Sequence, residues 1–180
     1  MEAWLRNNEH TIKILGIVVA AIFTLFEYFG HLSENRVQQT LVLYKEYSST
    51  QLIAARNGLV KETDSWWPEI KKMPEPTTQE AKIELRGKWR KHVLDRLHSN
   101  IELTTQTVTL LEFFDSLQVC IENNICDKKT AHDLLSTSAK ELAGNFCPYI
   151  AEMRYVRMNM MFADKANAFA GNVCHAEIYK

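Results

Sequence analysis

Glycine and proline, the residues that most often interrupt helices, are scarce: the sequence of 180 residues contains six glycines and four prolines. Alternation of β-branched and polar residues, the pattern of a half-buried strand, nowhere extends beyond about four positions. Strong helix formers fill most of the remaining stretches. The composition therefore argues against a sheet-based fold and predicts an all-α protein, with a single N-terminal transmembrane helix continuing into a four- to five-helix bundle.

Neither sign of charge predominates, because the formal net charge is −1. Such a chain has no overall basic field that would attract nucleic acid. No Gly-rich phosphate loop, HExxH or GxSxG motif occurs. We therefore expect a protein that is not an enzyme and that uses no cofactor and no metal.

The four cysteines do not show the paired spacing of a zinc site. Cys120 and Cys126, in the stretch CIENNIC, are close enough to form a disulfide, but free buried thiols are the favoured interpretation. Free thiols in turn favour a reducing compartment.

The stretch ILGIVVAAIFTLF, residues 14–26, is uncharged and apolar on every face. Its flanks extend the apolar window to about twenty residues, the length that crosses a bilayer. A cleavable signal is disfavoured because bulky FEYFG stands where small residues should be. A buried helix is disfavoured because a small domain cannot cover it. Residues 1–31 are thus predicted to hold an uncleaved membrane helix, about 11–31, with Trp4, Lys13 and Tyr28 at the lipid interface.

Within this helix, Gly16 and Ala20 have the small-xxx-small spacing that lets membrane helices approach. Glu27 either lies hydrated at the headgroup edge or faces a water-filled lumen shared by several copies. Basic residues are equally frequent on the two sides, so they do not decide the orientation. The cysteines favour a cytoplasmic C-terminal domain.

The rest of the chain divides into three parts. Residues 32–62 are predicted to form juxtamembrane helices, the second capped by Ser48 or Ser49 and ending near Gly58. Residues 63–77 hold three of the four prolines and read as a loop, with Trp66 and Trp67 pinned to the domain or to lipid. Residues 78–180 are predicted to be a bundle whose helices cover about 78–100, 101–122, 128–142 (capped by Asp127, with Gly144 just past its end) and 148–169, the last beginning at Pro148.

The stretch LLEFFDSLQVCIENNICDKKTAHDLLSTSAKELAGNFCPYIAEMR resembles a bacterial family catalogued as a domain of unknown function. Members of that family have one N-terminal membrane helix followed by a small helical domain. The resemblance implies the same architecture here, in the bacterial inner membrane.

In overall plan the chain is also similar to the small membrane accessory protein of type VI-B CRISPR systems. That family is described as a divergent HEPN-like domain that assembles into a membrane pore and strengthens RNA-guided phage defence. The resemblance implies a ring of subunits and an RNA-guided effector as partner. Arg154, Arg157 and Asn159, in RYVRMNMM, are candidates for a subunit interface or lumen, although a simple packing face is favoured.

Active HEPN ribonucleases carry Arg, four to six residues, then His. RGKWRKH supplies Arg86 and His92, but Gly87 takes the place of the usual polar residue. On a continuous helix the two side chains would point roughly 120° apart. The surrounding basic segment 82–98 is favoured as a solvated face over an RNA or headgroup patch, because acids interrupt it.

Three functions follow in order of preference. The first is a homo-oligomeric membrane protein of antiphage defence that forms a pore or perturbs the membrane. The second is a membrane-tethered module that binds a cytoplasmic partner through Trp66, Trp67 and the basic helix. The third is a tethered ribonuclease that uses Arg86 and His92.

Overall fold

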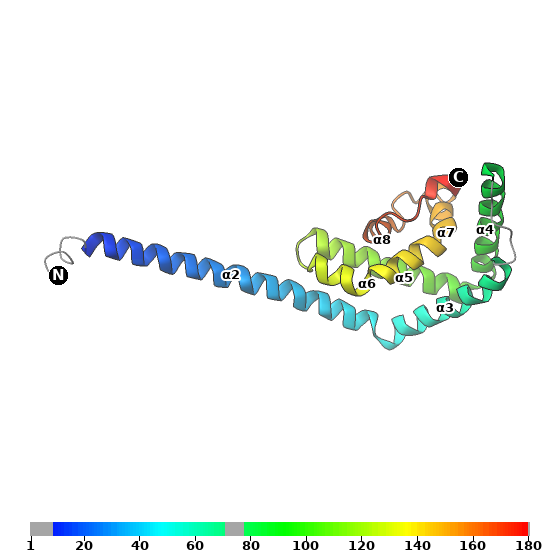
Figure 1. Cartoon of the computed structure of the whole chain (residues 1–180). Helices are drawn as coiled ribbons and strands as arrows, with labels where there is room; N and C mark the ends of the chain where they lie inside the picture. The colour runs from blue at the N-terminus through cyan, green and yellow to red at the C-terminus, as the bar shows by residue number, and fades with distance from the viewer. Residues whose placement is uncertain (1–8, 71–77, 180) are drawn as a thin grey trace.

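The computed structural model describes residues 9–70 and 78–179, and its described residues are helical with no strand (Figure 1). The predicted all-α class is confirmed. The α-helices are α2 (Glu9–Tyr47), α3 (Thr50–Ile70), α4 (Gln79–Ser99), α5 (Ile101–Glu122), α6 (Lys128–Asn145), α7 (Cys147–Ala151) and α8 (Asp164–Phe169). A π-helix, η1 (Glu152–Val156), and a 3-10 helix, η2 (Ala176–Tyr179), complete the chain.

Helix α2 is one continuous helix of 39 residues, ~58 Å long, which confirms the prediction that the apolar helix continues unbroken into the polar stretch after Leu32. Its N-terminal half projects away from the bundle, and its C-terminal half lies beside α3 and α6 (Figure 1). It is long and apolar enough to cross a bilayer. The apolar part ends near Leu32, because Glu34, Arg36 and Lys45 follow.

The predicted end of helix α3 near Gly58 is wrong, and so is the part of the predicted loop (63–77) that lies within α3. The helix begins directly after Ser49, passes through Gly58 and extends to Ile70; residues 71–77 lie outside the described part of the chain. A Cβ on Gly58 would collide with the end of the flexible Gln106 side chain of α5, so the glycine leaves room for that side chain. Trp66, buried in the last third of α3, gives the helix a tertiary reason to continue.

Helix α5 lies at the centre of the bundle, against α3, α4, α6 and α8. Its Phe114 ring stacks on Phe169 of α8, with ring centroids 5.8 Å apart, and also contacts Tyr47 at the end of α2. The predicted bounds of α4 and α5 and the Asp127 cap of α6 are confirmed. The largest fully buried side chains are Trp66, Phe114, Phe146, Phe169, Leu97, Leu111, Leu117, Leu135 and Ile150.

The predicted final helix at residues 148–169 is wrong in its continuity. Pro148 does lie in the first turn of α7, but the helix widens into η1 and ends at Val156. Met158 and Ala163 have left-handed φ angles of 60° and 53°, which no helix can contain. Gly144 likewise lies inside α6 rather than beyond it.

The prediction of free thiols is also wrong. Cys120 pairs with Cys126 across the turn after α5, and Cys147 of α7 pairs with Cys174 near the C-terminus. In each pair the Cα atoms are 5.2 Å apart. All four cysteines of the sequence are thus disulfide-bonded. This removes the basis on which a reducing compartment was expected.

The start of α6 is fixed to α2 by a compact hydrogen-bonded junction. The Asp127 backbone N–H donates to the Thr40 hydroxyl at 2.8 Å and to the Arg36 carbonyl at 3.3 Å. The Thr40 hydroxyl donates in turn to the same carbonyl at 2.9 Å, and Thr40 is fully buried. The Asp127 carboxylate caps α6 by accepting from the Thr130 N–H and hydroxyl. The long helix and the bundle are therefore held as one piece.

Replacement of Thr40 by valine tests this junction, because valine keeps the volume and removes the hydroxyl. We expect Thr40→Val to lower the free energy of unfolding by about 1–2 kcal/mol, the effect of losing a buried hydrogen-bond partner. Thr105→Val, at an exposed hydroxyl that bonds only within α5, should change it by less than about 0.5 kcal/mol. Guanidinium unfolding of the detergent-solubilised full chain, followed by near-UV circular dichroism, measures both. If the two substitutions lowered the free energy of unfolding equally, the proposed role of Thr40 in the junction would be contradicted.

Candidate functional site

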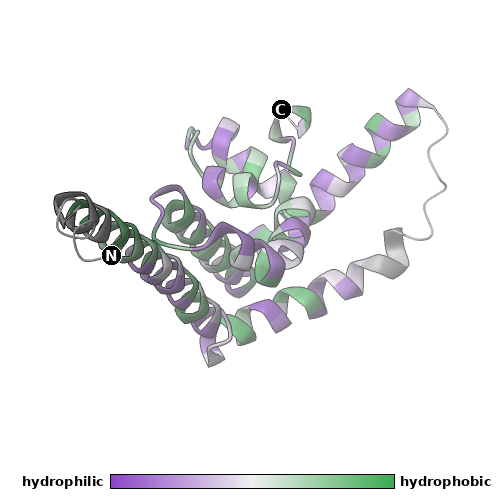
Figure 2. Ribbon diagram, turned by 60° about the vertical axis from the view of Figure 1, so that its left-hand side comes forward, coloured by the Kyte–Doolittle hydropathy of each residue, from purple (hydrophilic) through white to green (hydrophobic). Residues whose placement is uncertain are grey.

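The N-terminal half of α2 carries a continuous apolar surface, here called the anchor segment (residues 14–29). Its described large apolar side chains are between 45% and 73% exposed, and they surround the helix instead of forming one face. Figure 2 shows the change from hydrophobic to hydrophilic residues along α2 towards the bundle. The exposed members are Ile14, Ile17, Val18, Val19, Ile22, Phe23, Leu25, Phe26, Tyr28 and Phe29.

The one hydroxyl in the middle of the anchor segment is satisfied inside the helix. Thr24 donates to the carbonyl of Ala20 at 2.9 Å. In an apolar medium such internal satisfaction is required, because no water is present to replace it. The segment thus has both the surface and the hydrogen bonding of a helix surrounded by lipid.

The predicted association residues share one side of α2. Gly16, Ala20 and Glu27 lie within roughly 40° of one another around the helix axis. Ala20 and Glu27 are exposed, whereas the surroundings of Gly16, like those of Lys13, lie outside the described side chains. Trp4 lies in the part of the chain that is not described. Phe23, which is exposed, lies about 20° from Gly16 around the axis, so this side of α2 carries two small residues, a phenylalanine and an acid.

Trp66 packs into the domain, which is one of the two predicted alternatives, and it does not lie on an exposed contact surface. Trp66 is fully buried, and its indole N–H donates to Glu62 at 3.2 Å. Its ring meets Trp89 and Phe146 edge-on, which ties α3 to α4 and to the end of α6. Trp66 is therefore a core residue and not a lipid contact; the side chain of Trp67 lies outside the description.

The proposed ribonuclease pair is not brought together. His92 packs against the rings of both Trp66 and Trp89, with centroids 5.4 and 6.2 Å away. Arg86 lies on another side of the same unbroken helix, near Tyr179, where its charge opposes the rise in the pKa of that phenol caused by burial. A helix that is continuous from Arg86 to His92 keeps the two side chains apart.

A second polar cluster surrounds Glu152, which is buried on η1. Its carboxylate lies 3.0 Å from His98 Nε2 of α4 and 3.5 Å from the Arg157 guanidinium. Burial, and then the negative charge of Glu152, raise the pKa of the neighbouring Tyr149. π-Helices are frequent at functional sites. Here the π-helix directs a buried carboxylate towards an imidazole and a guanidinium, and the contact with His98 joins α4 to η1.

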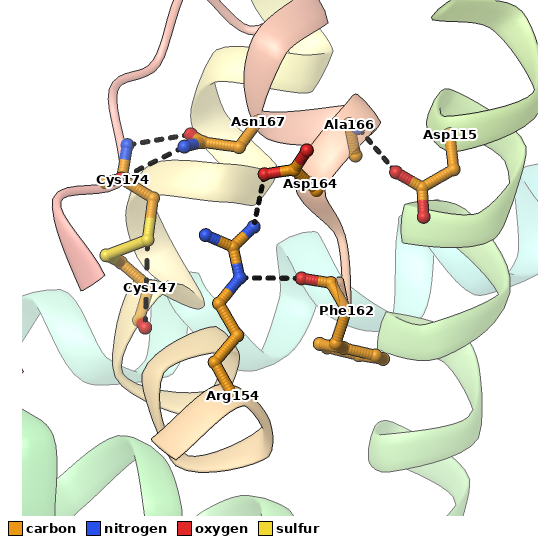
Figure 3. Close-up of polar contacts among 8 residues, drawn as sticks. All are labelled: Asp115, Cys147, Arg154, Phe162, Asp164, Ala166, Asn167 and Cys174. Carbon is orange, nitrogen blue, oxygen red and sulfur yellow. Dashed lines mark hydrogen bonds and ion pairs between the residues drawn. A yellow bond between two sulfur atoms is a disulfide. The ribbon is translucent and has the colours of Figure 1, made fainter. Parts of the chain in front are cut away.

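The segment after η1 is locked by polar contacts, shown in Figure 3. Arg154, whose side chain is only 12% exposed, donates through Nε to the Phe162 carbonyl at 2.8 Å and pairs with Asp164. Asp115 of α5 accepts from the Ala166 N–H at the start of α8. Burial raises the pKa of Asp115, and this backbone hydrogen bond opposes the rise.

The end of the chain is fixed by a reciprocal pair of hydrogen bonds. The Asn167 amide donates to the Cys174 carbonyl and accepts from the Cys174 N–H, each at 3.0 Å (Figure 3). The Cys147–Cys174 disulfide closes the same region covalently. Arg154 therefore has an internal structural role, which agrees with the favoured packing interpretation and argues against the alternative, a lumen or subunit interface.

These contacts fix the ends of an exposed loop, here called the methionine loop (residues 156–161). Val156, Met158, Met160 and Met161 are between 57% and 80% exposed, and Arg157 and Asn159 lie among them in exposed positions. Asn159 N–H donates to the Met153 carbonyl, and Phe162 N–H to the Asn159 carbonyl. The loop thus displays flexible apolar side chains from a fixed backbone, an arrangement typical of contact surfaces.

A cleft between the end of α2, α3, α5 and α6 has a volume of ≈ 90 Å³ and is lined by Tyr47, Arg56, Phe114 and Glu141 among others. Ligand pockets usually measure ~300–1,000 Å³. Within the described ranges, no group of three or more His, Cys, Asp or Glu is placed to hold a metal ion.

Comparison with known families finds that the model of a domain of unknown function, DUF4760, matches residues 14–170. The match begins in the anchor segment and ends just after α8, so it includes the apolar helix and the bundle together. Comparisons with curated proteins and with solved structures give no match. Because the matched range makes up most of the sequence, the chain belongs to the DUF4760 family.

Proposed function

We propose that the protein is a single-pass membrane protein without catalytic activity, whose anchor segment spans the bilayer and whose helical domain acts at the membrane surface. The observation that carries this proposal is the exposed apolar surface around the whole circumference of the anchor segment. A soluble protein of this size leaves no such surface in water. The rigid junction at Thr40 then places the bundle, and whatever it binds, at a fixed height above the lipid.

A membrane-extraction experiment tests the anchor. We expect the full chain to stay in the membrane pellet during an alkaline carbonate wash. Val18→Lys combined with Ile22→Lys places two charges near the helix centre, each costing roughly 3 kcal/mol, and should release the protein. Val42→Lys, at a residue 58% exposed on the same helix beyond the anchor, should have no effect. Complete release of the unaltered chain would contradict the proposal.

A second candidate, a homo-oligomer around a shared lumen, is favoured by two observations. The first is the common face of Gly16, Ala20 and Glu27, which permits close helix contact and supplies an acid that requires water or a partner. The second is the methionine loop, whose exposed apolar side chains, together with exposed Asn159 and the exposed part of Arg157, are accessible to a neighbouring copy. Antiphage defence and an RNA-guided effector as partner remain predictions from resemblance.

Mass measurement of the detergent-solubilised chain tests this candidate. We expect an oligomer that Gly16→Leu combined with Ala20→Leu converts to smaller species, because bulky side chains separate the helices. Ala21→Leu, about 100° away around the helix, should leave the assembly intact. A monomer for the unaltered chain at micromolar concentration would remove the homo-oligomer while leaving the membrane anchor untouched.

Orientation forms a third part of the proposal. Paired cysteines are typical of oxidising compartments, and disulfides are rare in the cytoplasm. Since basic residues do not favour either side, the two disulfides support a helical domain on the outer, oxidising face of the inner membrane, opposite to the expectation from free thiols.

Thiol labelling in cells measures this orientation. With a maleimide polymer added to denatured, unreduced samples, we expect no gel shift for the native chain and a shift after reduction. Cys126→Ser frees Cys120 and should be labelled without reduction, which shows that the reagent works. Labelling of all four native thiols without reduction would place the domain in the cytoplasm.

A further inference from the structure

The turn between α5 and α6 is the part of the bundle nearest to the anchor segment. We call residues 123–127 the α5–α6 tip. In Figure 1 the tip lies at the end of the bundle that faces the free half of α2, whereas α4 and the C-terminus lie at the opposite end. The hydrogen bond from the Asp127 N–H to the Arg36 carbonyl fixes the level of the tip on α2.

That level coincides with the lipid headgroups. A bilayer core takes about twenty helical residues, and the headgroup layer adds ~5–8 Å on each side. If the core ends between Phe29 and Leu32, Arg36 stands ~6–10 Å above it at 1.5 Å per residue. The tip is therefore placed where its side chains reach the headgroups, whichever of these residues marks the boundary.

The tip has the composition of an interfacial contact. Ile125 is 55% exposed, and Lys128 and Lys129 follow it in exposed positions at the start of α6. Asn124, with φ 56°, turns the chain in a left-handed conformation that asparagine tolerates. An apolar residue flanked by lysines inserts at a bilayer surface while its charges meet acidic headgroups.

The acids near the tip are occupied by partners of their own. Asp127 caps α6, and hydrogen bonds from Thr130 lower the pKa of its carboxyl. Glu122 pairs with Lys165 of α8 at 2.6 Å. The two lysines of α6 are both exposed, and the charge of Lys129 also lowers the pKa of the neighbouring Asp127 carboxyl. Their ammonium groups can therefore be reached by an approaching phosphate.

The tip is also rigid before it meets a surface. The Cys120–Cys126 disulfide closes it, and the Ile125 and Cys126 N–H groups both donate to the Cys120 carbonyl, at 3.0 and 3.1 Å. A preorganised contact loses little conformational entropy on binding. The Thr40 junction ties this rigid turn to the helix that enters the membrane.

From these observations we infer that the α5–α6 tip is a second membrane contact, in which Ile125 inserts at the interface and Lys128 and Lys129 bind acidic lipid headgroups. The contact would fix the tilt of the bundle on the bilayer, which a single helix alone leaves free. This inference rests on the proposed membrane anchoring. The occupant is the same bilayer that the anchor segment crosses.

Fluorescence quenching of the full chain in vesicles tests the tip. The vesicles contain equal parts of phosphatidylcholine and phosphatidylglycerol, with a nitroxide-labelled headgroup lipid as quencher. The emission that Ile125→Trp adds to the parent chain should be largely quenched. The emission added by Ile101→Trp, at a residue 86% exposed and ~32 Å away at the other end of α5, should be largely retained. Equal quenching of the two would overturn the inference.

The lysines are tested in the Ile125→Trp chain. Near an anionic surface, each of Lys128→Gln and Lys129→Gln should lower the ratio of docked to undocked tip about fivefold, whereas Lys140→Gln on the far part of α6 should not. Quenching that is unchanged in both variants, or in vesicles without phosphatidylglycerol, would overturn the recognition of acidic headgroups.

Flotation of the same vesicles separates failure of the tip from failure of the anchor. A chain that floats with the lipid but shows equal quenching at both positions is anchored without a tip contact. A chain that does not float overturns the anchor and the tip together.

Discussion

The hydrogen-bonded junction of Arg36, Thr40 and Asp127 is the contact on which the arrangement of this molecule depends. On one side of it lies an apolar segment whose exposed side chains, at about 1 kcal/mol each, would cost on the order of 10 kcal/mol in water. That cost is comparable to the whole stability of a typical domain, ~5–15 kcal/mol. The apolar segment is therefore expected to be shielded from water. Because the junction fixes the bundle to α2, the position of this segment also sets the position of the bundle.

The C-terminal part of the chain shows how a small domain can end firmly without a long last helix. The residues between Asp115 and Cys174 are joined by several kinds of contact. These are the π-helix, the contacts of Arg154 and Asp115, the hydrogen-bonded pair of Asn167 and Cys174, and the Cys147–Cys174 disulfide. The hydrogen bonds among them satisfy polar groups that a broken helix would otherwise leave unpaired, and the disulfide adds a covalent link. What remains exposed, the methionine loop, is held in place by this framework and takes no part in it.

Among the candidate site residues, those on α2 follow from sequence alone, because helix geometry fixes which positions share a face. Gly16, Ala20 and Glu27 fall together in any continuous helix. The environments of the candidate site residues in the bundle cannot be predicted from sequence in this way. From its sequence position, Trp66 could lie on the surface or in the core, and only its contacts with Trp89 and Phe146 place it in the core. Its spacing of four residues from Glu62 is compatible with a helix. Arg154 similarly reads as an interface residue until the Phe162 carbonyl is brought to it.

The helical class, the apolar start of α2, the bounds of α4 and α5 and the Asp127 cap of α6 could all be predicted from the order of the residues. These features depend on residues a few positions apart, through hydrophobic periodicity, side-chain capping and the scarcity of glycine and proline. The passage of α3 through Gly58, the break of the last helix after Val156 and the pairing of Cys147 with Cys174 could not be predicted in this way. Those features arise from contacts between segments distant in sequence, whose energies outweigh local preference only once the helices have packed.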